Sequence, residues 1–214
     1  KKGITIGYLA QNTGLTSDDT IIEEMTNVFA DLIALENKIH EYENKMADPN
    51  VNSNPEKLAE VSQTYDQLQA EFTSKNGFSY QAEIKAVLNG FGFGEDMYDH
   101  KISELSGGQQ TQLAMAKLLL QKKDLLILDE PTNHIDVKTI SWLEDYLKGY
   151  HGALLIISHD RFFMDKIVDQ VYDLSQGHMT HYVGNYSSYV EQKKINYQHQ
   201  LKEYEKQQKK IKEM

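Results

Sequence analysis

The sequence predicts an α/β fold: a largely parallel sheet with helices between its strands, an inserted helical hairpin and a C-terminal helix. Two apolar runs, residues 125–128 and 153–157, each end in polar residues and precede a helical pattern, which is typical of parallel strands buried on both faces. Between residues 25 and 72, apolar residues recur every three or four positions, which indicates paired helices. From residue 185 onward, one apolar stripe indicates a final helix.

Composition narrows the function classes. The 214 residues carry a formal net charge of −10, which argues against a protein coated in nucleic acid, although seven Lys and four Glu make residues 191–214 basic. No apolar run is long enough to cross a membrane, and no secretion signal is visible. The absence of cysteine excludes disulfides and fits a reducing compartment. We therefore expect a cytoplasmic protein without membrane insertion.

The N-terminal part combines one strand with a helical hairpin. Residues 4–9 alternate like a strand, residues 10–12 form a polar turn, and Asp18 is predicted to cap a helix. Apolar residues then follow a heptad pattern on both sides of a turn rich in Pro and Asn at residues 48–55: Met25, Val28, Leu32, Leu35, Ile39, Tyr42 and Met46, then Leu58, Val61, Tyr65, Leu68 and Phe72. This predicts a projecting antiparallel coiled coil, roughly 30 Å long; an ordinary helical subdomain packed on the core is the alternative.

The remaining elements alternate. Helices are predicted at residues 79–89, 107–121, 137–148 and 160–167, and strands at residues 125–129, 153–158, 170–174 and 178–183. The glycines between Gly90 and Gly94 lack the spacing of a dinucleotide site, and no strand precedes them. The final helix follows Gly184 and Asn185, with Val190, Tyr197, Leu201, Tyr204 and Ile211 on one stripe.

Two adjacent carboxylates follow the first apolar run. Asp129 is expected at the carboxyl end of its strand, where ligands bind in open α/β sheets, and is suited to holding Mg²⁺ directly or through water. Glu130 is placed to orient or deprotonate an attacking water. An isolated Asp-Glu pair would indicate a solvated loop, but the four apolar residues before it and Pro-Thr-Asn-His-Ile-Asp after it favour a functional site.

A glycine-rich turn opens the helix predicted at residues 107–121. Ser106, Gly107, Gly108 and Gln109 would let backbone amides approach a phosphate closely, and the helix dipole favours its negative charge. The alternative is a Ser cap on a loose turn. The carboxylates about twenty residues later favour phosphate binding.

Other polar residues follow the predicted strands. His159 ends the second apolar strand and could reach a terminal phosphate, although a helix-capping neighbour is the alternative. Gln11, after the first strand, could ligate Mg²⁺ or sense that phosphate through its amide. His134 and Asp136 lie in the turn after the carboxylates and are suited to contacting a facing subunit. The other six histidines lack metal-ligand spacing.

In this order, the motifs resemble those of an ATP-binding-cassette (ABC) ATPase, with a core like that of P-loop NTPases. Gln11 resembles the Q-loop, residues 105–109 the signature, residues 125–130 the Walker B strand, Asn133 to Asp136 the D-loop region, and His159 the switch histidine. The resemblance covers nearly the whole chain.

Four features resemble the ABC-F class, whose soluble members carry two cassettes and act on ribosomes. They are the segment Glu-Pro-Thr-Asn-His-Ile-Asp, the stretch 111–120 in place of the arginine-bearing run usual in transporters, the helical hairpin, and residues 182–189 leading into a helix rich in Lys, Gln and Tyr. That helix resembles the start of the inter-domain linker, which in this class reaches toward tRNA. Housekeeping translation and antibiotic protection both stay open.

The resemblance implies an ATP hydrolase that uses ATP and Mg²⁺. Residues 1–19 and 91–184 would form the cassette core, residues 20–90 a helical subdomain with an arm-like hairpin, and residues 185–214 the start of the linker. The family builds each ATP site from the Walker motifs of one cassette and the signature of the other. A second cassette of the same protein, the ribosome and tRNA are therefore the expected partners.

One family motif is missing. Gly-x-x-x-x-Gly-Lys-Ser/Thr, which cradles the phosphates, occurs nowhere in the sequence. We therefore expect a fragment that lacks the first strands and the second cassette, with negligible ATPase activity and weak nucleotide affinity at best. An unpaired sheet edge is expected to promote self-association.

The sequence disfavours two other functions. The ATPase subunit of a membrane transporter would need a membrane partner near the Q-loop, where this sequence carries a polar hairpin instead. An ATPase of DNA repair or chromosome structure would separate its halves by a very long coiled coil, whereas Gln11 and Ser106 are under a hundred residues apart. The basic final helix could contact phosphates and stack on bases, or be a solvated linker.

Overall fold

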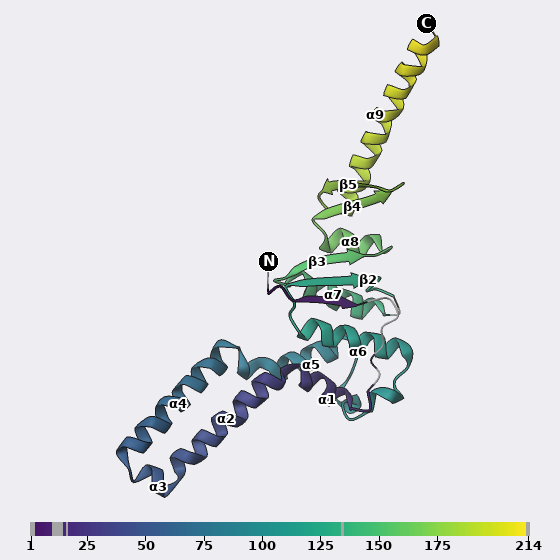
Figure 1. Ribbon diagram of the computed structural model, residues 1–214. Coiled ribbons are helices and arrows are strands. Elements are labelled where there is room, and N and C mark those ends of the chain that lie inside the picture. Colours follow the sequence, from purple (N-terminus) through teal and green to yellow (C-terminus); the bar gives the residue numbers. More distant parts are fainter. Residues whose placement is uncertain (1–2, 10–14, 16, 134, 213–214) are drawn as a thin grey trace. The chain divides into compact units, whose positions relative to one another are not determined.

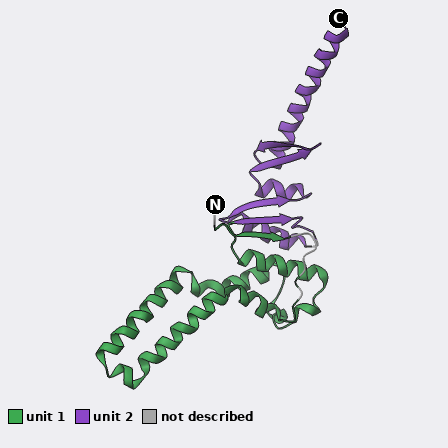
Figure 2. Ribbon diagram, in the orientation of Figure 1, with its two compact units in different colours: residues 1–124 green, residues 125–214 purple. Residues whose placement is uncertain are grey.

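The chain forms two compact units. The computed structural model describes residues 3–9, 15, 17–133 and 135–212 (Figure 1). The first unit covers residues 1–124 and the second residues 125–214 (Figure 2). The glycine-rich turn at Ser106 therefore belongs to the first unit, and the carboxylates Asp129 and Glu130 belong to the second.

Helices form most of the first unit. Its core contains α1 (Ile21–Thr26), α5 (Tyr80–Gly90) and α6 (Gly107–Leu120), with the strand β1 (Ile6–Leu9) packed on α6. Short 3₁₀ turns connect them: η1 (Asn27–Phe29), η2 (Gly77–Ser79), η3 (Glu95–Met97) and η4 (Ile102–Glu104). The largest fully buried side chains of this core include Ile21, Met25, Leu88, Phe93, Ile102, Leu113 and Leu119.

The predicted helical hairpin is confirmed, and we call it the arm (residues 30–74). It consists of α2 (Ala30–Ala47), α3 (Pro49–Asn52) and α4 (Pro55–Ser74), with α2 and α4 antiparallel (Figure 1). Leu35, Ile39 and Phe72 are buried between them, with Leu32, Tyr65 and Leu68 packed alongside. The heptad pattern therefore marks the residues that hold the two helices together.

Two local predictions differ from the structure. Thr20, not Asp18, caps α1, because Glu23 lies three residues later and completes a capping box: the Glu23 carboxylate accepts a hydrogen bond from the Thr20 N–H at 2.8 Å. The turn at the arm tip contains a helical turn, α3, because Asp48 caps it at the Asn50 N–H and Pro49 suits a first helical position.

Parallel pairing in the second unit confirms the predicted fold class. β2 (Leu125–Asp129) and β3 (Ala153–Ile157) run parallel, in a register that places Asp129 opposite Ile157. The connection between them contains α7 (Val137–Lys148), and α8 (Arg161–Ile167) follows β3. Fully buried side chains of this unit include Leu126, Leu128, Leu143, Leu147 and Phe163.

The chain continues as a β-hairpin and a long helix. β4 (Gln170–Ser175) pairs antiparallel with β5 (His178–Val183), and α9 (Tyr186–Lys212) follows. Lys193 of α9 lies 2.6 Å from the Asp173 carboxylate and donates to the Tyr189 hydroxyl, and these two contacts raise the pKa of Lys193. α9 buries none of its residues. No helix in the described ranges is long and apolar enough to cross a membrane.

Candidate functional site

The carboxyl ends of β2 and β3 lie together. Directly after β2, Glu130 takes a left-handed backbone conformation with φ 50°, which is uncommon outside glycine. Its N–H donates to the Ile157 carbonyl at 2.8 Å, so hydrogen bonding to β3 continues one residue past the strand. The left-handed residue then redirects the chain away from the sheet.

Glu130 and His159, which the sequence analysis predicted as separate site residues, are in contact. The His159 N–H donates to Glu130 Oε2 at 3.3 Å, and the imidazole Nε2 lies 3.5 Å from Oε1. The Glu130 side chain is only 11% exposed, whereas that of His159 is 99% exposed. A largely desolvated carboxylate therefore stands beside an imidazole that solvent or a ligand can reach.

Asp129, the last residue of β2, is a candidate oxygen ligand at the same strand end. It is half-buried, and Mg²⁺ prefers oxygen ligands. No cluster of three or more candidate metal-binding His, Asp or Glu side chains occurs among the described residues. Mg²⁺ at phosphate sites is commonly held by one or two carboxylates together with phosphate oxygens and water, so a single aspartate fits that ion.

The turn after the carboxylates is ordered by hydrogen bonds. The Asn133 N–H donates to the Glu130 carbonyl at 3.1 Å. Asp136 caps α7 by accepting from the N–H groups of Lys138 and Thr139 and from the Thr139 hydroxyl, the last at 2.7 Å. The Thr139 hydroxyl, followed by the backbone N–H groups, lowers the pKa of Asp136. The predicted residues His134 and Gln11 lie outside the described residues.

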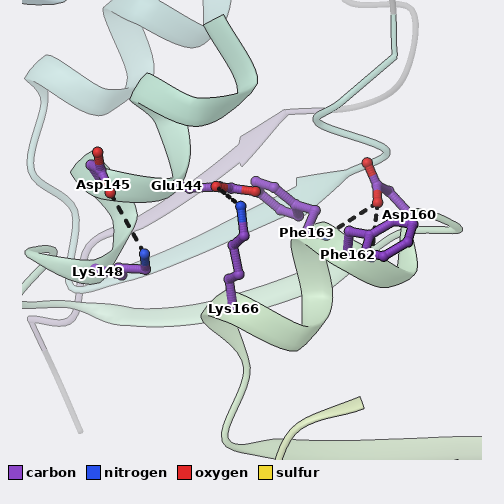
Figure 3. A network of polar contacts seen from close by, with 7 residues as sticks. All are labelled: Glu144, Asp145, Lys148, Asp160, Phe162, Phe163 and Lys166. Carbon is purple, nitrogen blue, oxygen red and sulfur yellow. Dashed lines mark hydrogen bonds and ion pairs between the residues drawn. The ribbon is translucent and has the colours of Figure 1, made fainter. Parts of the chain in front are cut away.

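Two helices hold the segment around His159. Asp160 caps α8 by accepting from the N–H groups of Phe162 and Phe163, and Phe163 is fully buried (Figure 3). Lys166 of α8 lies 2.6 Å from the buried Glu144 of α7. The turn at Asp136 and the turn at His159 are thus the starts of two helices joined by one ion pair.

Neither the cap at Asp160 nor the ion pair between Glu144 and Lys166 was predicted from the sequence. A short polar residue before Arg-Phe-Phe could have identified the cap at Asp160. The partner of Glu144 lies 22 residues away on another helix, and no sequence pattern indicates that pair.

At the start of α6, Ser106 and Gln109 form a capping box. Gln109 Oε1 accepts from the Ser106 N–H at 3.0 Å and from its hydroxyl at 2.9 Å, and Ser106 Oγ accepts from the Gln109 N–H. The predicted Ser cap is therefore present, but Gly107 and Gly108 are the first residues of α6 and not a loose turn. The first N–H groups of a helix have no intrahelical acceptors. A Cβ placed on Gly107 would meet nothing within 4 Å, so the backbone there is accessible to a ligand.

Two models of known protein families match most of the chain. The family described as "ABC transporter" matches residues 2–133, and a second family with the same description matches residues 172–214. Between them they include every predicted site residue except His134, Asp136 and His159.

Two curated relatives and one solved structure are similar to the chain. Identity is 51% over 210 residues with YdiF of Bacillus subtilis (strain 168), covering 98% of this chain and 32% of that protein. Identity is 32% over 191 residues with the energy-dependent translational throttle protein EttA of Mycobacterium tuberculosis (strain H37Rv), covering 89% of this chain and 33% of that protein. The structure of the ATP binding subunit of an ABC transporter has 15% identity and a TM-score of 0.54, covering 84% and 59%.

The similarities bear on the length of the chain and on its fold. The chain spans about a third of the length of the curated relatives YdiF and EttA. The likeness to the solved structure confirms that the α/β fold is that of an ABC ATPase domain.

Proposed function

Because the chain belongs to the ABC transporter family, we propose that it is part of an ABC-F ATPase that hydrolyses ATP in sites shared by two cassettes and acts on the ribosome. The contact between Glu130 and His159 at the end of the parallel strands carries the proposal of hydrolysis. The name of its relative EttA, a translational throttle protein, supports the proposal of a role in translation.

In this proposal each site residue has one task. Glu130 orients or deprotonates the attacking water, and His159 contacts the terminal phosphate. The N–H groups of Gly107 and Gly108, with Ser106 and Gln109, bind the phosphates of a nucleotide held by a facing cassette. Asp129 and Gln11 hold Mg²⁺, which when bound neutralises phosphate charge. Asn133, His134 and Asp136 face that second cassette.

The same proposal assigns the parts of the chain. Residues 1–19 and 91–184 are cassette core, residues 20–90 are the helical subdomain with the arm, and residues 185–214 begin a linker that reaches toward tRNA. The protein would work in the cytoplasm, in housekeeping translation or antibiotic protection.

Ribosome binding by the complete protein tests this function. Glu130→Gln, with the matching change in the other cassette, should retain ATP binding but stall hydrolysis, so that the protein pellets with ribosomes only when ATP is present. Asp145→Asn is a matched control, because Asp145 is a largely exposed carboxylate on α7. ATP binding without pelleting would reject the ribosomal role and favour a transporter subunit or a DNA-associated ATPase.

For the 214-residue chain alone, we propose negligible ATPase activity and weak nucleotide binding. The absent Gly-x-x-x-x-Gly-Lys-Ser/Thr motif supports this proposal, since that loop supplies most phosphate contacts in P-loop proteins. Titration calorimetry with ATP and Mg²⁺ should detect little heat. Saturable binding in the micromolar range would contradict it.

We also propose that the isolated chain self-associates through β3. This strand pairs with β2 on one edge and has no second strand partner among the described residues of its unit. Leu155 and Ile157 are about half exposed, and a cavity of about 1010 Å³ opens along β3 toward β4. An apolar strand edge without protecting charges recruits other chains.

Light scattering should therefore find dimers or larger species. Leu155→Lys should shift the chain toward monomer, whereas Phe162→Lys on the exposed face of α8 should not. A monomeric unmodified chain would reject this proposal.

A further inference from the structure

Both roots of the arm join a helix that forms an ion pair at α6. α1 runs through η1 into α2, and α4 returns through η2 into α5 (Figure 1). Glu24 of α1 lies 2.5 Å from Nζ of Lys117, which is on α6. Glu83 of α5 lies 2.6 Å from Nζ of Lys122, just past the end of α6. One ion pair thus attaches a root of the arm to α6, and the other attaches the second root two residues past the end of α6.

The pair formed by Glu24 and Lys117 is the more buried of the two. The Glu24 side chain is 9% exposed and that of Lys117 is 29% exposed, whereas the carboxylate and ammonium of the second pair are 30% and 57% exposed. Glu24 is flanked by Met25, which is fully buried. A carboxylate in such surroundings is costly without a partner, so Lys117 must stay in contact with α1.

Hydrogen bonds tie the start of α6 to α1 as well. The Ile102 N–H donates to the Asp19 carbonyl at 3.1 Å, directly before the cap of α1. Gln110 of α6 donates through Nε2 to the carbonyls of Ile102 and Leu105, at 3.2 and 3.3 Å. α6 is therefore held to α1 near Ser106 and again at Lys117, roughly 16 Å farther along the helix.

The arm is attached to the same group of helices at its base. The Tyr80 hydroxyl of α5 donates to the Glu36 carboxylate of α2 at 3.0 Å, and the Phe29 ring lies against the Tyr80 ring with centroids 5.5 Å apart. These contacts fix the direction in which α2 leaves η1. A continuous set of packed and hydrogen-bonded residues thus runs from the arm base to the turn at Ser106.

We propose that Glu24 is a positioning residue that, through Lys117, fixes α6 and the phosphate-binding turn at Ser106 relative to the root of the arm. A macromolecule that displaces the arm would displace this turn with it, so that binding at the arm regulates nucleotide binding by the signature. This regulatory consequence rests on the proposed function, but the positioning itself does not.

Hydrogen exchange at the start of α6 tests the positioning in the complete protein without nucleotide. The informative amides are those of Gln109 and Gln110, which donate to the Ser106 hydroxyl and carbonyl. Lys117→Met leaves the Glu24 carboxylate buried without its cation and should accelerate their exchange about tenfold, equivalent to about 1.4 kcal/mol of local opening.

Further variants separate positioning from general destabilisation. Lys117→Arg keeps the cation and should exchange like the unmodified protein. Adding Glu24→Gln to Lys117→Met removes the stranded charge but not the loss of the ion pair, so exchange should slow only in part and stay faster than in the unmodified protein. Lys75→Met, which breaks an ion pair with Glu71 whose side chains are both half exposed, is the matched control and should leave Gln109 and Gln110 unchanged.

The outcomes are distinguishable. Equal acceleration of all amides of α6, in step with a lower melting temperature, would reduce the pair to a general stabiliser and reject the proposal. Unchanged exchange in Lys117→Met would also reject it. Because no nucleotide is used, a failed ATPase or ribosome assay would overturn the proposed function and leave this measurement intact.

Discussion

Glu130 shows how one residue determines the shape of the candidate site. Its left-handed backbone costs free energy in a residue with a Cβ, and such conformations are often retained at functional sites. Here the conformation allows the Glu130 N–H to bind Ile157 while the carboxylate meets His159. The sequence predicted both side chains from the strand pattern, but nothing in it indicated the backbone conformation that brings them together.

A test at the residue scale concerns Asp136. Thr139→Val removes the hydroxyl that contributes most to lowering the pKa of Asp136, while the two backbone N–H donors remain. The pKa should therefore rise part of the way toward its ordinary value of 3.8. Carbon-detected NMR titration of the Asp136 carboxyl in both proteins measures the change. An unchanged pKa would contradict the expectation and show that the backbone N–H groups alone lower it.

An ion pair with a buried carboxylate joins α7 and α8. Lys166→Met leaves Glu144, which is 5% exposed, without its partner (Figure 3). We expect the free energy of unfolding to fall by about 1–3 kcal/mol. Lys148→Met is the control, because its partner Asp145 lies 3.6 Å away and is largely exposed, and its effect should stay within about 0.5 kcal/mol. Denaturant titration compares the two, and equal losses would contradict the expectation.

The base of the arm has no room for a methyl group at Gly77. A Cβ there would lie 2.4 Å from the Phe72 ring, which is itself buried against α2. Gly77→Ala should therefore cost about 1–3 kcal/mol through overpacking. Gly149→Ala serves as the comparison, since its Cβ would meet the Tyr146 carbonyl at an ordinary 3.6 Å and should change stability by at most about 0.5 kcal/mol. Thermal unfolding of both variants decides, and a tolerated Gly77→Ala would mean that the Phe72 ring shifts easily.

Sequence patterns predicted the elements better than their connections. The heptad spacing identified α2 and α4, and the apolar runs identified β2 and β3, because periodicity records which face is buried. The helix start at Thr20 was missed in favour of Asp18, although the capping box was visible in the sequence. The pairing of Glu24 with Lys117 could not be predicted, because 93 residues separate partners that only the tertiary structure brings together.

For the whole molecule, stability should depend on acid in a defined direction. Hydrogen bonds from neighbouring threonines lower the pKa values of three carboxyl groups. Thr20 lowers that of Glu23, Thr5 that of Asp124, and Thr139 that of Asp136. A carboxyl with a lowered folded-state pKa contributes stability that is present above its ordinary pKa, 4.5 for Glu and 3.8 for Asp, and lost as the pH falls through the folded value.

The urea concentration at the midpoint of unfolding should accordingly stay constant between pH 7 and about pH 5, and it should decrease when the pH is below about 4. Asp124→Asn should make the fall shallower, because one of the carboxyls with a lowered pKa no longer titrates. A midpoint that rises on acidification would contradict the assignment.

The residues that hold the arm helices together are not those that form its tip. The buried residues Leu35 and Phe72 lie toward the base and Ile39 lies near the middle of α2, whereas the tip helix α3 buries none. Whole heptads could therefore be inserted into, or removed from, both α2 and α4 next to α3 without changing the contacts at the base. Each heptad would lengthen or shorten the arm by roughly 10 Å. Arm length is consequently a property that evolution or an engineer can vary independently of the cassette, and the tip is a natural place for a spectroscopic label.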